Sequence, residues 1–568
     1  MEEQIEKLIS HAGGAGRYQI IILIIGFFIW SSLSLHNTSI PMLETVPEVK
    51  VNGNDTVVKL DYDICENKNY KITKKVGFSW IIDMDIYCEK GKVSMIGSFV
   101  YSGMTAGSLL FSVMNKLLTY RSLIIIFTFV YVFFLFLTTV IDNFGFRLFC
   151  LLCLGMCNGM SLMSTMTLVS ESVISSKRSL FAGIINVGYS FCPILYTPLY
   201  VILGKWRFIF WLQNIIAITC GIMYFIVLEN SARMYFSKNK TEEAIEVLRR
   251  IAAFNGKLEE FEEKSNDKEF DGFLRNEQEG VEKDLTTEMK PKYGPSALFK
   301  YPSVRYKFLI FTFMFMSTVF LTNAVVINTK SMEGNTYVII VSLYCVEVVA
   351  GVTCGFIINI PILGRKKSLI GFYLGITLGF VLTSLFDSAV GAWLAQVLIR
   401  FCITGVFTTF YIYFMESYPT PLRSLGFGLN STFGNLAGIV SPVIIEYTNK
   451  YLLYVAFAIL SGIDIFLTFF LKETVGKPML ETIEELEVPD VEKEKLIPGR
   501  DSDVNNLVKG PSSKDSKENV PKQTKEPLLS DINSSDKKEN SAKEEKKEPL
   551  LKEKIDKKEE EKEETGEE

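Results

Sequence analysis

Twelve long apolar segments dominate this chain and restrict what it can fold into. Each is about 19–25 residues long with few or no charges, which is the length that a membrane-spanning helix requires. Buried helices of soluble proteins are rarely this long or this numerous. The sequence therefore predicts an all-α membrane protein with twelve transmembrane helices. The segments are 18–36, 94–115, 122–141, 148–170, 179–203, 208–228, 306–328, 336–360, 368–386, 391–415, 424–446 and 451–471.

A short charged motif occurs twice, about 245 residues apart. Glu171 precedes Arg178 by seven residues, and Glu416 precedes Arg423 by the same spacing. Both copies lie between one apolar segment and the next. A repeat of this length within membrane segments predicts two homologous six-helix bundles, as in transporters that rock around a central site. The expected bundles are residues 18–228 and 306–471.

The Lys and Arg residues of the short loops predict the orientation in the membrane. Most of them fall on one side, which also carries both termini, so this side is expected to be cytosolic. The orientation predicts a cytosolic N-terminus (1–17), an extracellular loop (37–93), a cytosolic central loop (229–305) and a cytosolic tail (472–568). Few aromatic residues and many charges predict that most of the tail is disordered.

The expected extracellular loop contains two features of exported segments. Asn54 begins an Asn-Asp-Thr glycosylation sequence. Cys65 and Cys88 lie in the same loop and could form a disulfide in an oxidising exterior, although nothing in the sequence fixes their distance. Three cysteines share the segment 148–170, where packing is a simpler explanation than metal binding because no His accompanies them. We expect no metal and no cofactor.

The tail carries a candidate sorting signal. Leu496 and Ile497 follow Glu492 with the spacing of an acidic dileucine motif, which would bind trafficking adaptors. We expect the plasma membrane as the location, with an endosomal or vacuolar membrane as the alternative.

Several short motifs, spread in order over residues 13–487, resemble the organic cation, anion and carnitine transporter family of the major facilitator superfamily. This resemblance implies the major facilitator fold and transport of a small organic solute. Sugar porters share some of the motifs. The motifs are Gly16-Arg17-Tyr18-Gln19, Asp85 to Glu89, Trp206-Arg207, Gly334 to Tyr337, Glu416 to Gly426, and Glu481 to Glu484.

The chain departs from the superfamily pattern in two cytosolic loops. Lys116 and Pro361 occupy the positions at which the resemblance implies Asp. That Asp normally helps to hold the two bundles together by helix-end and Arg contacts. Its loss predicts a weaker lock between the bundles, or a protein that no longer alternates.

Acidic residues inside apolar segments are candidate functional groups, because charges are costly at that depth. Glu347 lies near the middle of the eighth segment and could attract a cationic group, carry a coupling proton or form a structural bridge. We expect no Lys or Arg at the same depth to pair with it. Asp464 in the twelfth segment is a second candidate for coupling, unless its helix is peripheral.

Five polar or aromatic positions are further candidates for binding the solute. The resemblance implies Asp or Arg at Asn435 and two Tyr residues at Thr322 and Asn323, so a smaller, neutral or zwitterionic solute is expected. Tyr411 and Tyr413 are aromatic candidates in the tenth segment. For each of these residues the alternative is a packing contact between helices.

The repeated charges are candidates for gating. We expect Glu171 with Arg178, and Glu416 with Arg423, to form salt bridges at cytosolic helix ends that break and re-form as the bundles rock. Shared ancestry of the two halves could also explain the repeated spacing. Arg121 and Arg365, in the loops that follow the second and eighth segments, are expected to contribute.

The sequence favours a secondary transporter or facilitator of a small organic solute over an enzyme. No nucleotide-binding loop, zinc motif or nucleophile elbow occurs in a suitable context, and nucleic acid is not an expected partner. The expected partners are the solute and the lipid bilayer. A solute sensor that signals through its tail, or a sugar-porter-like carrier, are the alternatives.

Overall fold

The computed structural model describes residues 2–476 except 52–56, 60–64, 66–69, 75–78, 116, 239, 266–295, 333 and 386–387. Within these residues, 12 helices are long and apolar enough to cross a membrane, which confirms the predicted fold class. Six precede the central loop: α2 (Arg17–Thr38), α6 (Lys90–Met114), α7 (Tyr120–Val140), α8 (Phe144–Ser172), α9 (Ser175–Leu203) and α10 (Trp206–Val227). Six follow it: α16 (Pro302–Ser331), α17 (Thr336–Ile357), α18 (Gly364–Leu385), α19 (Ala389–Ser417), α20 (Thr420–Tyr447) and α21 (Lys450–Phe469).

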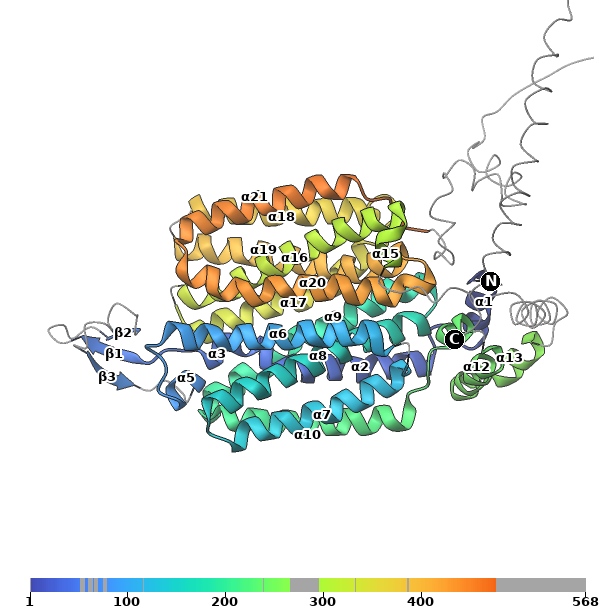
Figure 1. Cartoon of the computed structure of the whole chain (residues 1–568), viewed down its shortest axis with the longest axis horizontal. Helices are drawn as coiled ribbons and strands as arrows, with labels where there is room; N and C mark the ends of the chain where they lie inside the picture. The colour runs from blue at the N-terminus through green and yellow to red at the C-terminus, as the bar shows by residue number, and fades with distance from the viewer. Residues whose placement is uncertain are drawn as a thin grey trace, which may run out of the picture. The chain divides into compact units, whose positions relative to one another are not determined.

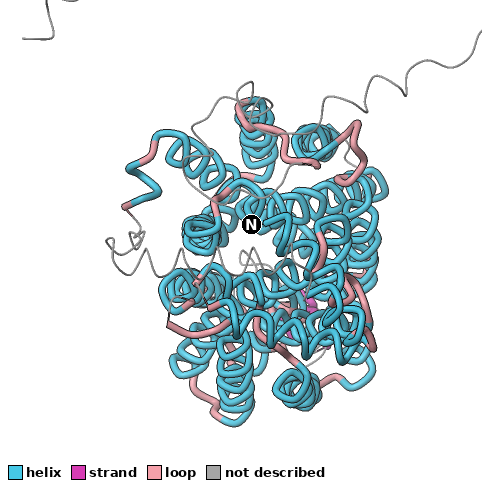
Figure 2. The backbone as a smooth tube through the Cα atoms, turned by 90° about the vertical axis from the view of Figure 1, so that its right-hand side faces the viewer, coloured by secondary structure: helices cyan, strands magenta, loops and turns pink. Residues whose placement is uncertain are grey.

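The two sets of six helices, called here the first half and the second half, lie side by side (Figure 1). Helices α6 and α9 of the first half pack along α20 and α17 of the second half. In the view of Figure 2 most of the long helices run towards the viewer, as expected for a bundle that crosses a bilayer. These two helix pairs therefore form most of the interface between the halves.

Short elements cover the two ends of the bundle, named here the outer end and the inner end (Figure 1). The outer end carries α3 (Ile40–Leu43), α5 (Trp80–Asp83) and an antiparallel sheet in the order β2-β1-β3. Its strands are β1 (Glu48–Val51), β2 (Val57–Lys59) and β3 (Tyr70–Lys74). The inner end carries α1 (Glu2–His11), α11 (Ala232–Ser237), α12 (Thr241–Asn255), α13 (Leu258–Ser265) and α15 (Ala297–Lys300).

Several membrane helices begin at a polar side chain that binds a free backbone N–H group. Thr119 accepts from the N–H of Ser122 at the start of α7, and Asn143 accepts from that of Phe146 at the start of α8. Helices α8, α9 and α19 each have 29 residues. At about 1.5 Å per residue they exceed a hydrocarbon core of about 30 Å, so their ends extend beyond it.

Glycines bring α6 and α8 into close contact within the first half. A Cβ atom on Gly103 would lie 2.1 Å from the carbonyl oxygen of Leu152, and one on Gly155 would lie 2.2 Å from that of Val100. No larger residue fits at either position without separating the helices. This is the small-residue packing that membrane helices use in place of the hydrophobic effect.

The outer loop is attached to the first half by a buried arginine. The Arg147 side chain is 1% exposed and forms ion pairs with Asp83 and Asp142. Its guanidinium also lies 5.1 Å from the ring of Trp206 and 5.7 Å from that of Trp80. Helix α5, which carries Asp83 and Trp80, is thereby held against the starts of α8 and α10.

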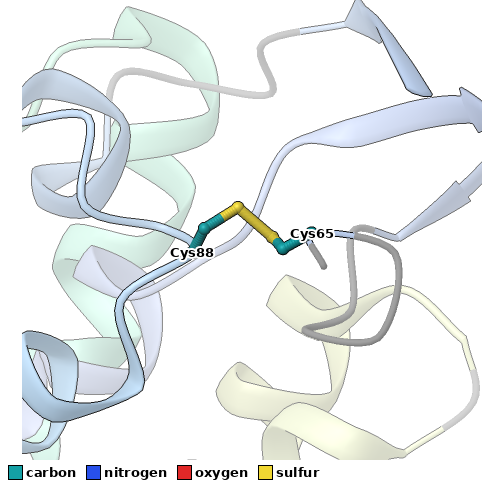
Figure 3. Close-up of a disulfide and its surroundings, with 2 residues drawn as sticks. All are labelled: Cys65 and Cys88. Carbon is teal, nitrogen blue, oxygen red and sulfur yellow. A yellow bond between two sulfur atoms is a disulfide. The ribbon is translucent and has the colours of Figure 1, made fainter. Parts of the chain in front are cut away.

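A disulfide joins Cys65 to Cys88 in the same loop, with 5.7 Å between their Cα atoms (Figure 3). The sequence suggested these two cysteines as a possible disulfide. The three cysteines of α8, Cys150, Cys153 and Cys157, are free and buried. Asn54, Lys116 and the dileucine Leu496-Ile497 lie outside the described residues.

Candidate functional site

A cavity of about 120 Å³ lies between the two halves. One water molecule needs about 10–15 Å³ of such space, so the cavity has room for several waters or a small solute. Both halves contribute polar side chains to its wall. Those of the first half include Asn37, Tyr101, Asn186, Tyr189 and Ser190, and those of the second include Thr322, Asn323, Tyr344, Glu347, Arg400 and Thr404.

A buried ion pair forms part of the wall. An Arg400 Nη1 atom donates to Glu347 Oε1, and the two side chains are 4% and 10% exposed. The Arg400 guanidinium also lies 5.2 Å from the ring of Tyr344. The other Glu347 oxygen accepts a 2.7 Å hydrogen bond from Ser190 Oγ on α9. Glu347 therefore links its basic partner in the second half to the first half.

The expectation that no Lys or Arg lies at the depth of Glu347 is wrong. Arg400 is eleven residues from the start of α19, and Glu347 is eleven residues from the start of α17. Both helices start at the outer end, so equal counts along them bring the two charges to the same depth. The eighth and tenth segments cross the membrane in the same direction. Counting residues from the start of each segment would have shown that Glu347 and Arg400 lie at the same depth.

Hydrogen bonds cross between the halves around the cavity. Tyr101 Oη donates to Asn323 Oδ1 over 2.6 Å. Asn186 Nδ2 donates to Thr408 Oγ1 over 3.0 Å, and Ser98 Oγ donates to the carbonyl oxygen of Ile439 over 3.0 Å. Each of these bonds must break or exchange partners if the halves move apart.

Of the six solute-binding candidates, Glu347, Asn323 and Thr322 line the cavity. The described wall does not include the other three. Asn435 Nδ2 donates to Ser108 Oγ over 3.2 Å, which is a packing contact between the halves. Tyr411 packs edge-on against Trp30, and Tyr413 donates to the carbonyl oxygen of Lys472. For these three residues the structure agrees with the packing alternative.

Asp464 also lies away from the cavity wall. Its side chain is 0% exposed and accepts a hydrogen bond from Ser317 Oγ on α16. Nearby, Thr377 and Ser461 form a hydrogen bond of 2.8 Å between their hydroxyl groups. Asp464 thus belongs to a polar cluster inside the second half, and the expectation that it could face the cavity is not met.

The inner end of the interface is closed by a second set of polar contacts. Arg365 Nη2 lies 2.8 Å from Glu416 Oε1, with side-chain exposures of 6% and 11%. Arg365 also donates to Ser179 Oγ over 3.4 Å, and Ser179 donates to Asn359 Oδ1 over 2.8 Å. Since Ser179 lies near the start of α9, these bonds connect the second half to the first.

The repeated charges contact other groups. Glu416 forms an ion pair with Arg365, Glu171 accepts a hydrogen bond from Ser231 Oγ, and Arg178 Nε donates to the carbonyl oxygen of Ser170 over 3.1 Å. The sequence led us to expect the pairs within each repeat instead. A seven-residue spacing places each Glu and Arg on two consecutive helices, so it does not determine which Glu faces which Arg.

Arg121 does not join this set. It donates to the carbonyl oxygen of Phe225 over 2.8 Å and connects α7 to α10 within the first half.

The loop with Pro361 in place of Asp has another source of negative charge. Glu473 accepts from the backbone N–H groups of Arg365 and Lys366, each over 3.0 Å, at the start of α18.

The comparisons with known proteins agree with this geometry. The family model of the Major Facilitator Superfamily matches residues 22–442. Organic anion transporter 3 of Oryctolagus cuniculus is 26% identical over 365 residues, which span 62% of this chain and 63% of that relative. Solute carrier family 22 member 15-like of Xenopus laevis is 25% identical over 466 residues, which span 79% of this chain and 89% of that relative.

A solved structure has the same fold at low sequence identity. The proton:xylose symporter XylE bound to 6-bromo-6-deoxy-D-glucose superimposes with a TM-score of 0.59 and 12% identity. The match covers 86% of this chain and 99% of the symporter. With twelve apolar helices in the part of the chain that the structure describes, this protein is an integral membrane protein. It belongs to the Major Facilitator Superfamily and, within it, resembles the organic ion transporters as a divergent member.

Proposed function

We propose that this protein is a secondary transporter or facilitator that moves a small organic solute across a membrane by alternating access. The cavity that both halves line carries the proposal, because a solute held there contacts both moving parts. The closed inner end fits one state of such a cycle, in which Arg365, Glu416 and Ser179 hold the halves together. Family membership favours transport over an enzymatic reaction.

The cavity favours a solute that carries an anionic group. Arg400 supplies a cation in the wall that cannot be deprotonated, and amides and hydroxyls of both halves supply further donors. Several of the similar proteins are named organic anion transporters, and the match covers about 58–63% of their length. The neutral or zwitterionic solute expected from Asn435 loses its support, because Asn435 lies outside the wall.

We place the protein in the plasma membrane by default. Trafficking adaptors that read Leu496-Ile497 would move it to endosomes or vacuoles. Deleting residues 488–568 tests both this prediction and the sensor alternative. A transporter keeps its flux without the tail, whereas a sensor that signals through the tail loses its output.

Counterflow in proteoliposomes tests the transport proposal. Vesicles preloaded with one unlabelled solute are diluted into the same labelled solute, using p-toluenesulfonate, tetraethylammonium, trimethylglycine and glucose in turn. We expect saturable, trans-stimulated exchange of the sulfonate. Protein with Arg400→Gln, checked for folding by gel filtration, should lose it.

If the protein exchanged only one of the other three solutes, its substrate would belong to that class rather than to the anions. If glucose were the exchanged solute, the protein would be a sugar-porter-like carrier. If folded protein exchanged none of the four, transport would be the wrong function, and the cavity would be better explained as the binding site of a sensor.

A further inference from the structure

The paired charges of the cavity also indicate whether an ion is transported together with the solute. Arg400 and Glu347 neutralise each other at the same depth, about eleven residues from the outer ends of their helices. Both side chains are nearly buried, so the surroundings do not screen a charge as water does. A charged solute that binds one partner therefore changes the net charge of a poorly solvated site.

Few other groups near the pair can titrate. The described helices packed against α17 contribute polar groups and phenols, and α16 contributes Thr322 and Asn323, which do not titrate. Phenols and thiols lose their protons well above neutral pH. The titratable groups around the pair are Tyr344 on α17, Tyr189 and Cys192 on α9, Tyr101 on α6, and the carboxyl of Glu44 after α3.

An anion that binds Arg400 competes directly with Glu347. If Glu347 stays ionised, the pair and the bound anion together carry one positive and two negative charges, and the carboxyl of Glu44 in the same wall offers no compensation. If a Glu347 oxygen takes a proton from a hydronium ion, the O–H bond of the hydronium breaks, a water molecule is released, and the pair with its bound anion is neutral again. The neutral arrangement is the one that can cross between the two sides at low cost.

A cation that displaces Arg400 from Glu347 cannot be compensated in the same way. A cation that binds Glu347 releases Arg400, and a guanidinium cannot shed its proton at physiological pH. The site would then carry an uncompensated positive charge. The pair is therefore asymmetric, because a proton can neutralise its acidic member but nothing equivalent can neutralise its basic member.

Ser190 makes the protonated state compatible with the present geometry. Its hydroxyl now donates to Glu347 over 2.7 Å. A hydroxyl can also accept, so a protonated Glu347 can donate to the same oxygen without moving. The contact between the halves then survives the change of charge.

We propose that this protein carries an organic anion together with one proton, and that Glu347, once released from Arg400, is the proton acceptor. The inference rests on the proposed function and adds the driving ion. The site without solute and the site with anion and proton have the same charge. Transport is therefore electroneutral and responds to a pH gradient rather than to membrane potential.

Uptake of an anion driven by a pH gradient tests this inference. Proteoliposomes alkaline inside, with the membrane potential clamped at zero by potassium and valinomycin, receive labelled p-toluenesulfonate. This anion stays ionised near neutral pH, so it does not cross as a neutral acid. We expect accumulation of about tenfold for each pH unit, the ratio for one proton per anion. An internal pH dye should report acidification that requires the anion.

Two variants test whether Glu347 is the group that accepts the proton. Glu347→Gln imitates the protonated carboxyl and cannot release a proton, so we expect both the accumulation driven by the pH gradient and the acidification that requires the anion to be lost. Asp464→Asn is the matched control, because it removes a buried carboxyl of the same half that lies outside the cavity. We expect it to keep the accumulation.

The outcomes separate this inference from the proposed function. Exchange without accumulation or anion-dependent acidification in the unaltered protein overturns proton coupling and leaves transport intact. Exchange of trimethylglycine alone, insensitive to pH, replaces the anion and proton by a zwitterion. If Asp464→Asn rather than Glu347→Gln abolishes accumulation, the acceptor is assigned wrongly. Absence of all exchange overturns both proposals. If Glu347→Gln does not fold, the dye measurement on the unaltered protein still decides.

Discussion

At the scale of single residues, the buried pair Arg400–Glu347 is the most consequential feature of the molecule. Each charge alone at this depth would be costly, and the pair offsets that cost only while both members are present. Such a pair contributes little net stability compared with apolar packing, but it is strongly unfavourable to break. Its presence in the wall of a cavity points to a role in function rather than in stability.

Removing one member of the pair should destabilise the protein more than removing both. Arg400→Gln leaves Glu347 buried without its cation, with a cost of about 3–5 kcal/mol if the carboxylate stays ionised. The double variant with Glu347→Gln leaves no buried charge, so part of the stability should return. Thermal unfolding in detergent at neutral pH measures both. Equal loss in the single and double variants would show that the pair is not the cause.

Glu473 should make the inner end sensitive to acid. Burial alone would raise its pKa, but hydrogen bonds from the backbone N–H groups of Val475, Arg365, Lys366 and Thr474 lower it below 4.5. A carboxyl with a lowered pKa stabilises the folded state above its ordinary pKa, and this contribution is lost as pH falls through the folded value.

We therefore expect Glu473→Gln to melt at a lower temperature than the unaltered protein near pH 7. The two melting temperatures should converge as the pH is lowered below 4.5. A difference that stays constant down to that pH would mean that the carboxylate charge is not what holds this loop.

At the scale of elements, glycines of α9 and α17 bring the backbones of the two halves into close contact. A Cβ on Gly183 would lie 2.7 Å from the carbonyl oxygen of Gly351, which is rigid backbone. This contact lies seven residues from Ser190 towards the inner end of α9, so it closes the interface on the inner side of the cavity. The apolar pattern predicted both helices, but the pattern alone does not tell which faces meet.

Gly183→Ala should favour opening at the inner end. The added methyl group forces α9 and α17 apart where they now touch, so hydrogen exchange should become faster in the 358–366 loop. Gly462→Ala on α21 is the matched control, since a Cβ there meets nothing within 4 Å. It should change exchange little and stabilise its helix by about 0.5–1 kcal/mol. Equal exchange in both variants would exclude the glycine contact as a gate.

At the scale of the whole molecule, two interfaces between the halves surround one cavity. The inner contacts of Arg365, Glu416 and Ser179 close one end, and the hydrogen bonds of Tyr101 and Asn186 lie beside the cavity. Alternating access requires that the inner contacts open while each half moves as a unit.

Cross-linking the halves at the inner end should therefore stop transport. Ser179→Cys with Asn359→Cys places a pair where side-chain atoms of the two halves now lie 2.8 Å apart. We expect oxidation to abolish counterflow and a reductant to restore it. Thr377→Cys with Ser461→Cys, also 2.8 Å apart but within the second half, should leave flux unchanged. Flux that persists through the inner cross-link would exclude alternation at this interface.

The fold and some of the site could be predicted from the sequence, because hydrophobic length and repetition are local properties of the chain. Twelve apolar segments and a repeated motif were sufficient for the fold class. Glu347 stood out as a charged residue in an apolar helix, resemblance to a family suggested Asn323 and Thr322, and all three line the cavity. Resemblance to a family also suggested Asn435, but equivalent positions in a divergent chain need not keep the same surroundings.

Only the tertiary structure decided which side chains meet. It paired Arg400 with Glu347 and Arg365 with Glu416, and it placed Ser179 of the first half against Asn359 of the second. These contacts depend on how each helix is rotated about its axis and on which helices are neighbours. The sequence alone determined that the chain crosses a membrane as two related bundles, since apolar length is read along one helix. The pairing of charges depends on several helices at once, so it emerges only when they are packed together.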